Sequence, residues 1–255
     1  MSLQLRSYVK HVILKKDYNL DIRHKHFYSD FYCLTMKMSQ LKLGCLPLDD
    51  LLNGGIEKQI ITEIYGEAGS GKTNFCLQAA RECASNDKKV AYIDSEGVSI
   101  ERLHQICKSE SDYKKILNDI LFFSPTSLDK QEKMIAEALK IKNLGLIVVD
   151  TINLFYRINL EDDLEGAMRS FVRQVANLQI AAREKNIRVL LAEQVYTDKN
   201  GDIKPFTNRD TEHMIKTIIK LEKTGTGERK ATIIKHRSQP EGKNTLFKIT
   251  KNGLE

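Results

Sequence analysis

Gly66-Glu67-Ala68-Gly69-Ser70-Gly71-Lys72-Thr73 is the stretch of this 255-residue chain that decides its fold. It fits the pattern G-x-x-x-x-G-K-[ST] of a phosphate-binding P-loop. The glycines let backbone N–H groups converge on an anion, and a helix that begins where the loop ends adds its positive N-terminal end. In this pattern Lys72 reaches the β- and γ-phosphates, and the Thr73 hydroxyl ligates Mg²⁺. We therefore predict ATP and Mg²⁺ as ligands of residues 66–73.

The residues on both sides of this stretch strengthen the prediction. An apolar run at 59–65 precedes the glycines, and residues 72–86 have the apolar spacing of a helix. A random match to the pattern would rarely follow a strand and open a helix. The sequence therefore predicts a strand, a P-loop and a helix in this order.

A carboxylate supplies a second anchor for the metal ion. Asp150 ends the apolar run 144–150, which is typical of a strand buried on both faces. Ligands of open α/β sheets bind at the carboxyl ends of the strands, so Asp150 is predicted to hold Mg²⁺ through its water shell. The alternative is a polar residue that simply ends a strand.

Two further strand ends carry side chains suited to hydrolysis. Glu96 follows the predicted strand 89–94, where a carboxylate can accept the proton of an attacking water. Gln194 follows the predicted strand 187–192, and its amide could contact the γ-phosphate. The residues alone leave a solvated loop acid and a strand-end amide equally open as alternatives.

The whole chain alternates between strand-like and helix-like patterns. Strands are predicted at 59–65, 89–94, 119–123, 144–150 and 187–192, and helices at 72–86, 99–109, 128–141 and 163–185. After Asp210 the pattern changes to strands at 215–223, 230–236 and 245–250, joined by glycine-containing turns. This predicts an α/β fold with a mainly parallel sheet flanked by helices and antiparallel strands at its C-terminal edge.

Composition limits the class of protein. No apolar run approaches the ~18 residues of a membrane helix, the N-terminus has no signal-peptide pattern, and five cysteines without C-x-x-C spacing suggest reduced thiols. We therefore expect a cytoplasmic protein without a membrane partner. The net charge of +6 divides into +4 for residues 1–37, −4 for 38–213 and +6 for 214–255. Basic ends favour a polyanion partner, and a charge-rich surface of a heat-adapted protein is the alternative.

The predicted domain boundary separates residues 1–37 from an ATPase domain at 38–255. Residues 1–37 lack glycine and proline and have poor helical periodicity. Two interpretations stay open for this extension. In the first, translation begins at Met36 or Met38 and the start is mis-annotated. In the second, the extension is a genuine basic arm.

Several stretches resemble the RecA/RadA recombinases, in the same order and over residues 41–255. They are Leu43-Gly44-Cys45-Leu46-Pro47-Leu48-Asp49-Asp50-Leu51-Leu52-Asn53-Gly54-Gly55-Ile56, Tyr65 to Asn74, Tyr92-Ile93-Asp94-Ser95-Glu96-Gly97 with Glu101-Arg102-Leu103, Val148-Val149-Asp150-Thr151, Glu193-Gln194-Val195 and Lys235-His236-Arg237-Ser238-Gln239-Pro240-Glu241-Gly242. The resemblance implies a RecA-like P-loop ATPase core. It further implies that Glu96 activates water, that Arg102 packs on the adenine ring and that Gln194 senses the γ-phosphate. The resemblance also places Pro240 in a turn that, in filaments formed by members of this family, caps the nucleotide bound to a neighbouring subunit.

Departures from the family pattern shape the expected function. Residues 1–37 are too short for the N-terminal DNA-binding domain and lack its Phe-x-x-Ala linker motif, and residues 195–213 lack the glycine-rich DNA loop. The resemblance therefore implies a DNA-binding accessory protein of recombination and repair with weak ATPase activity. Its implied partners are DNA, the main RadA-type recombinase and a Holliday-junction resolvase, whose cleavage of branched DNA it would modulate.

Charge offers one candidate surface for DNA phosphates, namely Lys230, Lys235, His236, Arg237, Lys243 and Lys248. Two other functions stay open: a filament-forming, DNA-dependent ATPase recombinase, and a P-loop phosphotransferase for a small molecule. Oligomeric state is left open by the sequence.

Overall fold

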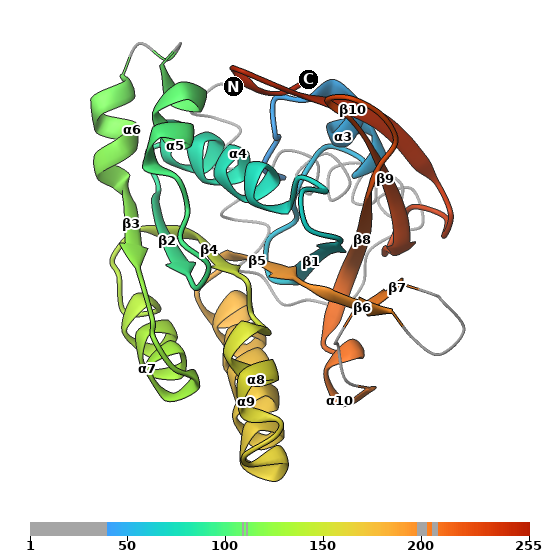
Figure 1. Ribbon diagram of the computed structural model, residues 1–255. Helices are drawn as coiled ribbons and strands as arrows, with labels where there is room; N and C mark the ends of the chain where they lie inside the picture. Colours follow the sequence, from blue (N-terminus) through green and yellow to red (C-terminus); the bar gives the residue numbers. More distant parts are fainter. Residues whose placement is uncertain (1–39, 109, 111, 198–202, 206–208) are drawn as a thin grey trace, which may run out of the picture. The chain divides into compact units, whose positions relative to one another are not determined.

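The computed structural model describes residues 40–108, 110, 112–197, 203–205 and 209–255. Both interpretations of residues 1–37 lie outside this part of the chain. The described residues form a nine-stranded sheet in the order β11-β10-β9-β8-β1-β5-β4-β2-β3 and a separate two-stranded ribbon, β6-β7 (Figure 1).

The centre of the sheet is parallel. Its strands are β1 (Ile61–Gly66), β2 (Lys89–Asp94), β3 (Ile120–Phe123), β4 (Leu144–Asp150), β5 (Arg188–Glu193) and β8 (Ile215–Lys223). Strands β1, β4 and β5 are buried along their whole length, and in β4 this burial corresponds to a continuous apolar run up to Asp150. Parallel pairing brings the carboxyl ends of β1, β2, β4 and β5 to one edge of the sheet.

The C-terminal strands extend the sheet with antiparallel pairing. β9 (Glu228–Lys235) pairs with β8, β10 (Asn244–Thr250) pairs with β9, and β11 (Gly253–Leu254) pairs with β10. This confirms the predicted fold class, a mainly parallel sheet with antiparallel strands at the C-terminal edge.

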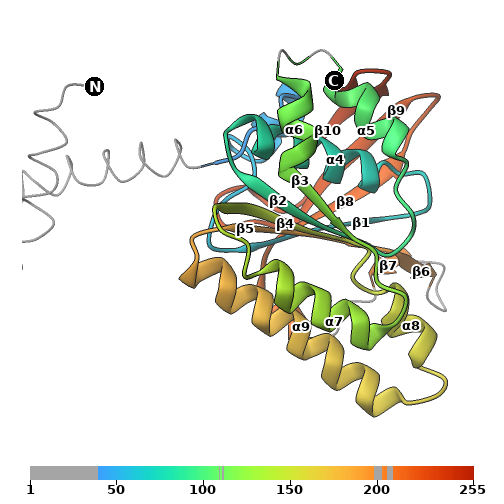
Figure 2. The same ribbon diagram turned by 90° about the vertical axis from the view of Figure 1, so that its left-hand side faces the viewer.

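Helices cover the two faces of the sheet (Figure 2). One layer contains α3 (Leu46–Leu51), α4 (Lys72–Ser85), α5 (Ile100–Cys107) and α6 (Tyr113–Asp119). The other contains α7 (Leu128–Ala138), α8 (Leu154–Asn159) and α9 (Leu164–Glu184). Each layer encloses its own apolar core: the first core includes Phe75, Leu77 and Tyr92, and the second includes Phe171 and Leu178.

The structure adds elements that the periodicity did not predict. Strand β5 is followed by β6 (Val195–Thr197), β7 (Ile203–Pro205) and the short helix α10 (Arg209–Glu212), where the sequence indicated a loop. Helices α3, α6 and α8 are six or seven residues long. Segments of this length show too few repeats of the helical period to be recognised from spacing alone.

Candidate nucleotide-binding site

The P-loop joins β1 to α4 in a conformation that its glycines permit. Gly71 has φ of +105° and immediately precedes Lys72, the first residue of α4. A Cβ on Gly66 would lie 2.2 Å from the carbonyl oxygen of Leu221 on β8. Glycine is therefore required at these two positions for different reasons, one conformational and one steric. The result is a helix N-terminus directed at the loop, as anion binding needs.

Lys72 lies at the centre of this loop and is 8% exposed. Its Nζ donates to the carbonyl oxygens of Gly66 at 2.8 Å and Glu67 at 3.1 Å. Burial lowers the pKa of Lys72, while the nearby carboxylates Glu96 and Asp150 raise it. The ammonium group is thus held inside the loop, close to two acids from other strands.

Asp150 is buried at the end of β4, with 1% of its surface exposed. Its Oδ2 accepts a hydrogen bond of 2.7 Å from the Tyr92 hydroxyl, and the Thr73 hydroxyl also hydrogen-bonds to the carboxylate. Its Oδ1 has no hydrogen-bond partner among the described residues, and neither has the buried Ser70 Oγ. Buried polar atoms without partners are costly, so these two oxygens fit a site whose ligand completes them.

The donor set fits magnesium bound with a nucleotide. Mg²⁺ prefers hard oxygen ligands, keeps several waters and takes one or two protein oxygens together with phosphates. The Thr73 hydroxyl and the Asp150 carboxylate are the residues that would hold it. Bound there, the ion would neutralise phosphate charge during transfer.

The raised pKa of Asp150 makes the free energy of unfolding depend on pH. Burial raises this pKa from the ordinary 3.8 to about 6, against hydrogen bonds from Tyr92 and Thr73, which lower it. Between about pH 4 and pH 6 the native state therefore retains a proton that the unfolded chain has released, so this group's contribution to stability falls as pH rises.

The variant Asp150→Asn cannot ionise and should escape this loss. We expect its free energy of unfolding, relative to the original protein, to increase between about pH 4 and about pH 7. Urea unfolding of both nucleotide-free proteins across this range measures the difference. A difference independent of pH would show that Asp150 titrates as an ordinary exposed carboxylate.

Glu96 and Gln194, predicted from separate strand ends, meet in the structure. Gln194 Nε2 donates to Glu96 Oε1 at 2.5 Å, and the Thr151 hydroxyl donates to the same oxygen at 2.9 Å. Asp94 fixes the turn that carries Glu96, because its two oxygens accept from the backbone N–H groups of Gly97 and Val98, each at 2.8 Å. The carboxylate is therefore positioned by three strands, β2, β4 and β5.

Arg102 lies on α5 beside the start of α4. Its Nε donates to Asn74 Oδ1 at 2.7 Å, and its Nη2 and Nη1 donate to the carbonyl oxygens of Thr250 at 2.8 Å and Lys251 at 3.0 Å. The C-terminal turn thus fixes the plane of this guanidinium next to the P-loop helix. A fixed plane suits the stacking on adenine that the resemblance implies.

Comparison with known proteins decides the family. The Rad51 family model matches residues 35–255. The chain belongs to the Rad51 family. It is 45% identical over 220 residues to the DNA repair and recombination protein RadB of Methanococcoides burtonii, covering 84% of this chain and 97% of the relative. RadB of Pyrococcus furiosus is 38% identical over 222 residues, with 84% and 95% covered.

A solved structure agrees with these relatives. The crystal structure of the RadB recombinase superposes with a TM-score of 0.75 and 34% identity, covering 84% of this chain and 98% of that one. Within the Rad51 family the chain is thus a recombination and repair paralogue of the RadB type, as its motifs indicated. Proteins with this fold generally bind nucleotides together with Mg²⁺.

Some residues at this Rad51-family site carried no signal in the motifs. Arg229 on β9 donates from Nε to the carbonyl oxygen of Gly69 at 3.0 Å, and the Nζ of Lys223 would lie 3.1 Å from a Cβ placed on Gly69. Lys223 and Arg229 are cross-strand partners in the β8-β9 hairpin. Two cations from the C-terminal hairpin therefore lie against the P-loop, although more than 150 residues separate them from it in the chain.

Acidic side chains share the sheet face that carries two of the basic C-terminal residues. Lys230 and Lys248 lie on the face of β9 and β10 that is turned away from α4, together with Glu228, which pairs with Lys248. On β8 the same face carries Lys220 and Glu222, joined by an ion pair of 2.8 Å. The two glutamates offset part of the charge of Lys220, Lys230 and Lys248, so the charge contributed by these five residues is lower than that of the lysines alone.

His236 adds no charge to this region at neutral pH. Burial lowers its pKa, and the cations Lys243 and Arg237 lower it further. Its Nδ1 accepts a hydrogen bond from the Ser238 backbone N–H at 3.1 Å. Pro240 lies in the exposed turn between β9 and β10, the place that the resemblance assigned to the cap of a neighbouring site.

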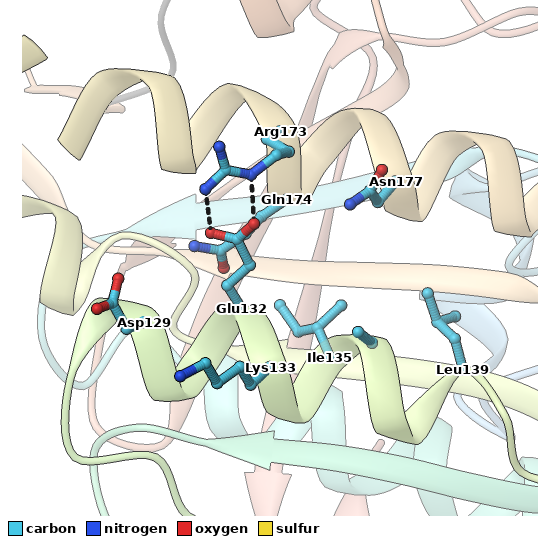
Figure 3. A pocket seen from close by; sticks show the side chains of 9 residues that line it. Asp129, Glu132, Lys133, Ile135, Leu139, Arg173, Gln174 and Asn177 are labelled. Atoms are coloured by element: carbon cyan, nitrogen blue, oxygen red, sulfur yellow. Dashed lines mark hydrogen bonds and ion pairs between the residues drawn. The ribbon is translucent and has the colours of Figure 1, made fainter. Parts of the chain in front are cut away.

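A groove between α7 and α9 lies on the other helix layer and is separate from the nucleotide site (Figure 3). Arg173 and Glu132 form a two-bond ion pair across it, and Ile135, Leu139 and Asn177 contribute to its walls.

In the part of the chain that the structure describes, no helix has the length and apolarity needed to cross a bilayer.

Proposed function

We propose that this chain is an ATP-binding, DNA-binding accessory protein of homologous recombination and repair with weak, magnesium-dependent ATPase activity. The buried Asp150 carboxylate carries the proposal, because one of its two oxygens has no hydrogen-bond partner among the described residues. The carboxylate also hydrogen-bonds to Thr73 and lies within charge range of Lys72. The P-loop glycines and the likeness to RadB relatives support the same assignment.

The proposed reaction is hydrolysis of the γ-phosphate by an activated water. Lys72 would move its donors from the neutral Gly66 and Glu67 carbonyls to negatively charged phosphate oxygens. The hydrogen bonds that the Glu96 side chain accepts from described residues both end on Oε1, which leaves Oε2 to take the proton of water.

DNA binding is proposed through phosphate contacts of the C-terminal strands. We expect affinity for duplex DNA to fall linearly on a log–log plot against salt, with a slope of about −0.9 for each phosphate neutralised. The double variant Lys230→Ala/Lys248→Ala should make this slope shallower by about two such units, with Lys114→Ala on α6 as the matched control. Fluorescence anisotropy across a salt series measures the slopes; an unchanged slope in the double variant would exclude this face.

Turnover and assembly distinguish the proposal from a filament-forming recombinase. An accessory protein should hydrolyse ATP at a rate that single-stranded DNA changes little, and it should bind the RadA-type recombinase and a Holliday-junction resolvase in pull-down assays. Strong stimulation by DNA, with filaments visible by electron microscopy, would favour the recombinase instead. Membership of the Rad51 family leaves the phosphotransferase alternative without support.

A further inference from the structure

A chain of side-chain hydrogen bonds runs through the proposed γ-phosphate sensor. Arg157 on α8 donates from Nη1 to Gln194 Oε1, and Gln194 donates from Nε2 to Glu96 Oε1 at 2.5 Å. The three residues come from α8, from the end of β5 and from the turn after β2. They therefore connect a helix of the second layer with the carboxylate edge of the sheet.

The backbone of Gln194 is fixed independently of this chain. Asn153, which is fully buried, donates from Nδ2 to the Gln194 carbonyl oxygen at 3.0 Å and accepts from the Gln194 N–H at 3.1 Å. This reciprocal pair holds the main chain at the end of β5. What remains to be set is the orientation of the side-chain amide, which can present either its oxygen or its nitrogen on a given side.

Arg157 and Glu96 together decide between these two orientations. A guanidinium can only donate hydrogen bonds and an ionised carboxylate can only accept them. With Arg157 on one side and Glu96 on the other, the oxygen of the Gln194 amide must face Arg157 and its NH₂ group must face Glu96. The flipped amide would place oxygen against carboxylate and nitrogen against guanidinium, which is repulsive at both ends.

This orientation has a consequence for nucleotide recognition. The Gln194 NH₂ group has two hydrogens, and Glu96 takes one of them. The second is available to a phosphate oxygen on the Glu96 side, where Lys72 also lies within charge range. A flipped amide would instead offer an oxygen to the phosphate and repel it.

We propose that Arg157 is a positioning residue that orients the Gln194 amide so that it donates to the γ-phosphate, and that this sets the preference of the site for ATP over ADP. The inference rests on the proposed nucleotide site and adds to it the residue that makes the site selective. Arg157 does not touch the nucleotide in this scheme; it acts through Gln194 alone.

Equilibrium binding of ATP and ADP in the presence of Mg²⁺ tests the proposal without requiring turnover. The affinities of Arg157→Met, Arg157→Lys and the original protein are measured by competition with a fluorescent nucleotide. We expect Arg157→Met to lower the ratio of ATP to ADP affinity by about tenfold, the size expected for one hydrogen bond to a charged group. Arg157→Lys retains a donor and should keep most of the preference. The control Arg169→Met, in an exposed ion pair with Glu165 on α9, should leave the ratio unchanged.

Two variants of Gln194 make the test independent of how well Arg157→Met folds. Gln194→Glu has two acceptor oxygens and should lose the preference although Arg157 is intact. In the Gln194→Ala background, adding Arg157→Met should change the ratio no further, because the two residues act in series.

The outcomes separate the inference from the proposed function. A lower ratio of ATP to ADP affinity in Arg157→Met and in Gln194→Glu supports the role of Arg157, provided that adding Arg157→Met to Gln194→Ala lowers the ratio no further. An equal weakening of ATP and ADP, or a further loss in the Gln194→Ala background, would overturn it while leaving the nucleotide site in place. An original protein that binds neither nucleotide would overturn the proposed function, and the inference with it.

Discussion

Lys72→Ala is expected to abolish measurable ATP binding while the protein stays folded. Lys72 supplies the charge that balances the β- and γ-phosphates, and each lost charge-assisted hydrogen bond costs about 1.5–3 kcal/mol. Loss of two such bonds weakens binding by at least about a hundredfold. Isothermal titration with ATP and Mg²⁺ measures the effect.

The unliganded protein should tolerate this substitution. Burial lowers the pKa of Lys72, so the nucleotide-free fold gains little from the buried charge. Thermal unfolding should therefore change little, and Lys140→Ala, which removes an exposed lysine paired with Glu137, is the matched control for binding. Unchanged ATP affinity in Lys72→Ala would refute the assignment of the site.

Glu96→Gln is expected to stop hydrolysis with little effect on nucleotide affinity. The amide oxygen of glutamine can still accept from Thr151 and Gln194, so the local structure is kept, but it cannot take a proton from water. Removing a general base lowers turnover by about 10²–10⁴-fold. Phosphate release at saturating ATP measures the rate, and competition binding measures the affinity.

A nearby acid provides the control for this second substitution. Glu101 is exposed in the first turn of α5, and Glu101→Gln removes a similar charge without a contact to the site. It should hydrolyse ATP at the original rate. Residual turnover of Glu96→Gln close to that of Glu101→Gln would mean that another group activates the water.

Motifs with local physical requirements were readable from the sequence. The P-loop could be recognised because Gly66 and Gly71 satisfy a steric and a conformational requirement that no other residue meets. Strands β2, β4 and β8 were predicted with the bounds that the structure shows. Burial on both faces leaves apolar runs in β2 and β4, whereas in β8 the partly buried lysines alternate with buried apolar residues. Parallel pairing then brought Glu96, Asp150 and Gln194 to one edge, as the strand ends implied.

The remaining parts of the site depend on contacts between distant segments. No spacing in the sequence indicates that Arg157 meets Gln194, that Arg229 contacts Gly69 or that the carbonyl of Thr250 holds Arg102. These contacts depend on the register of strands and on where short helices such as α8 place one side chain. From the sequence alone, a single arginine in a short helix is predicted to lie on the surface, because most arginines do.

By itself, the sequence determined the P-loop and the α/β order of the chain, because each follows from local backbone demands or from runs of apolar residues. Its motifs, through their resemblance to known proteins, also indicated its place in the Rad51 family. Only the tertiary structure decided how the site is assembled: which oxygen of Asp150 lacks a partner, how the Gln194 amide is oriented and which C-terminal cations lie against the loop. The physical reason is that hydrogen bonds are short and directional, so they are fixed only when packing brings their partners within about 3 Å.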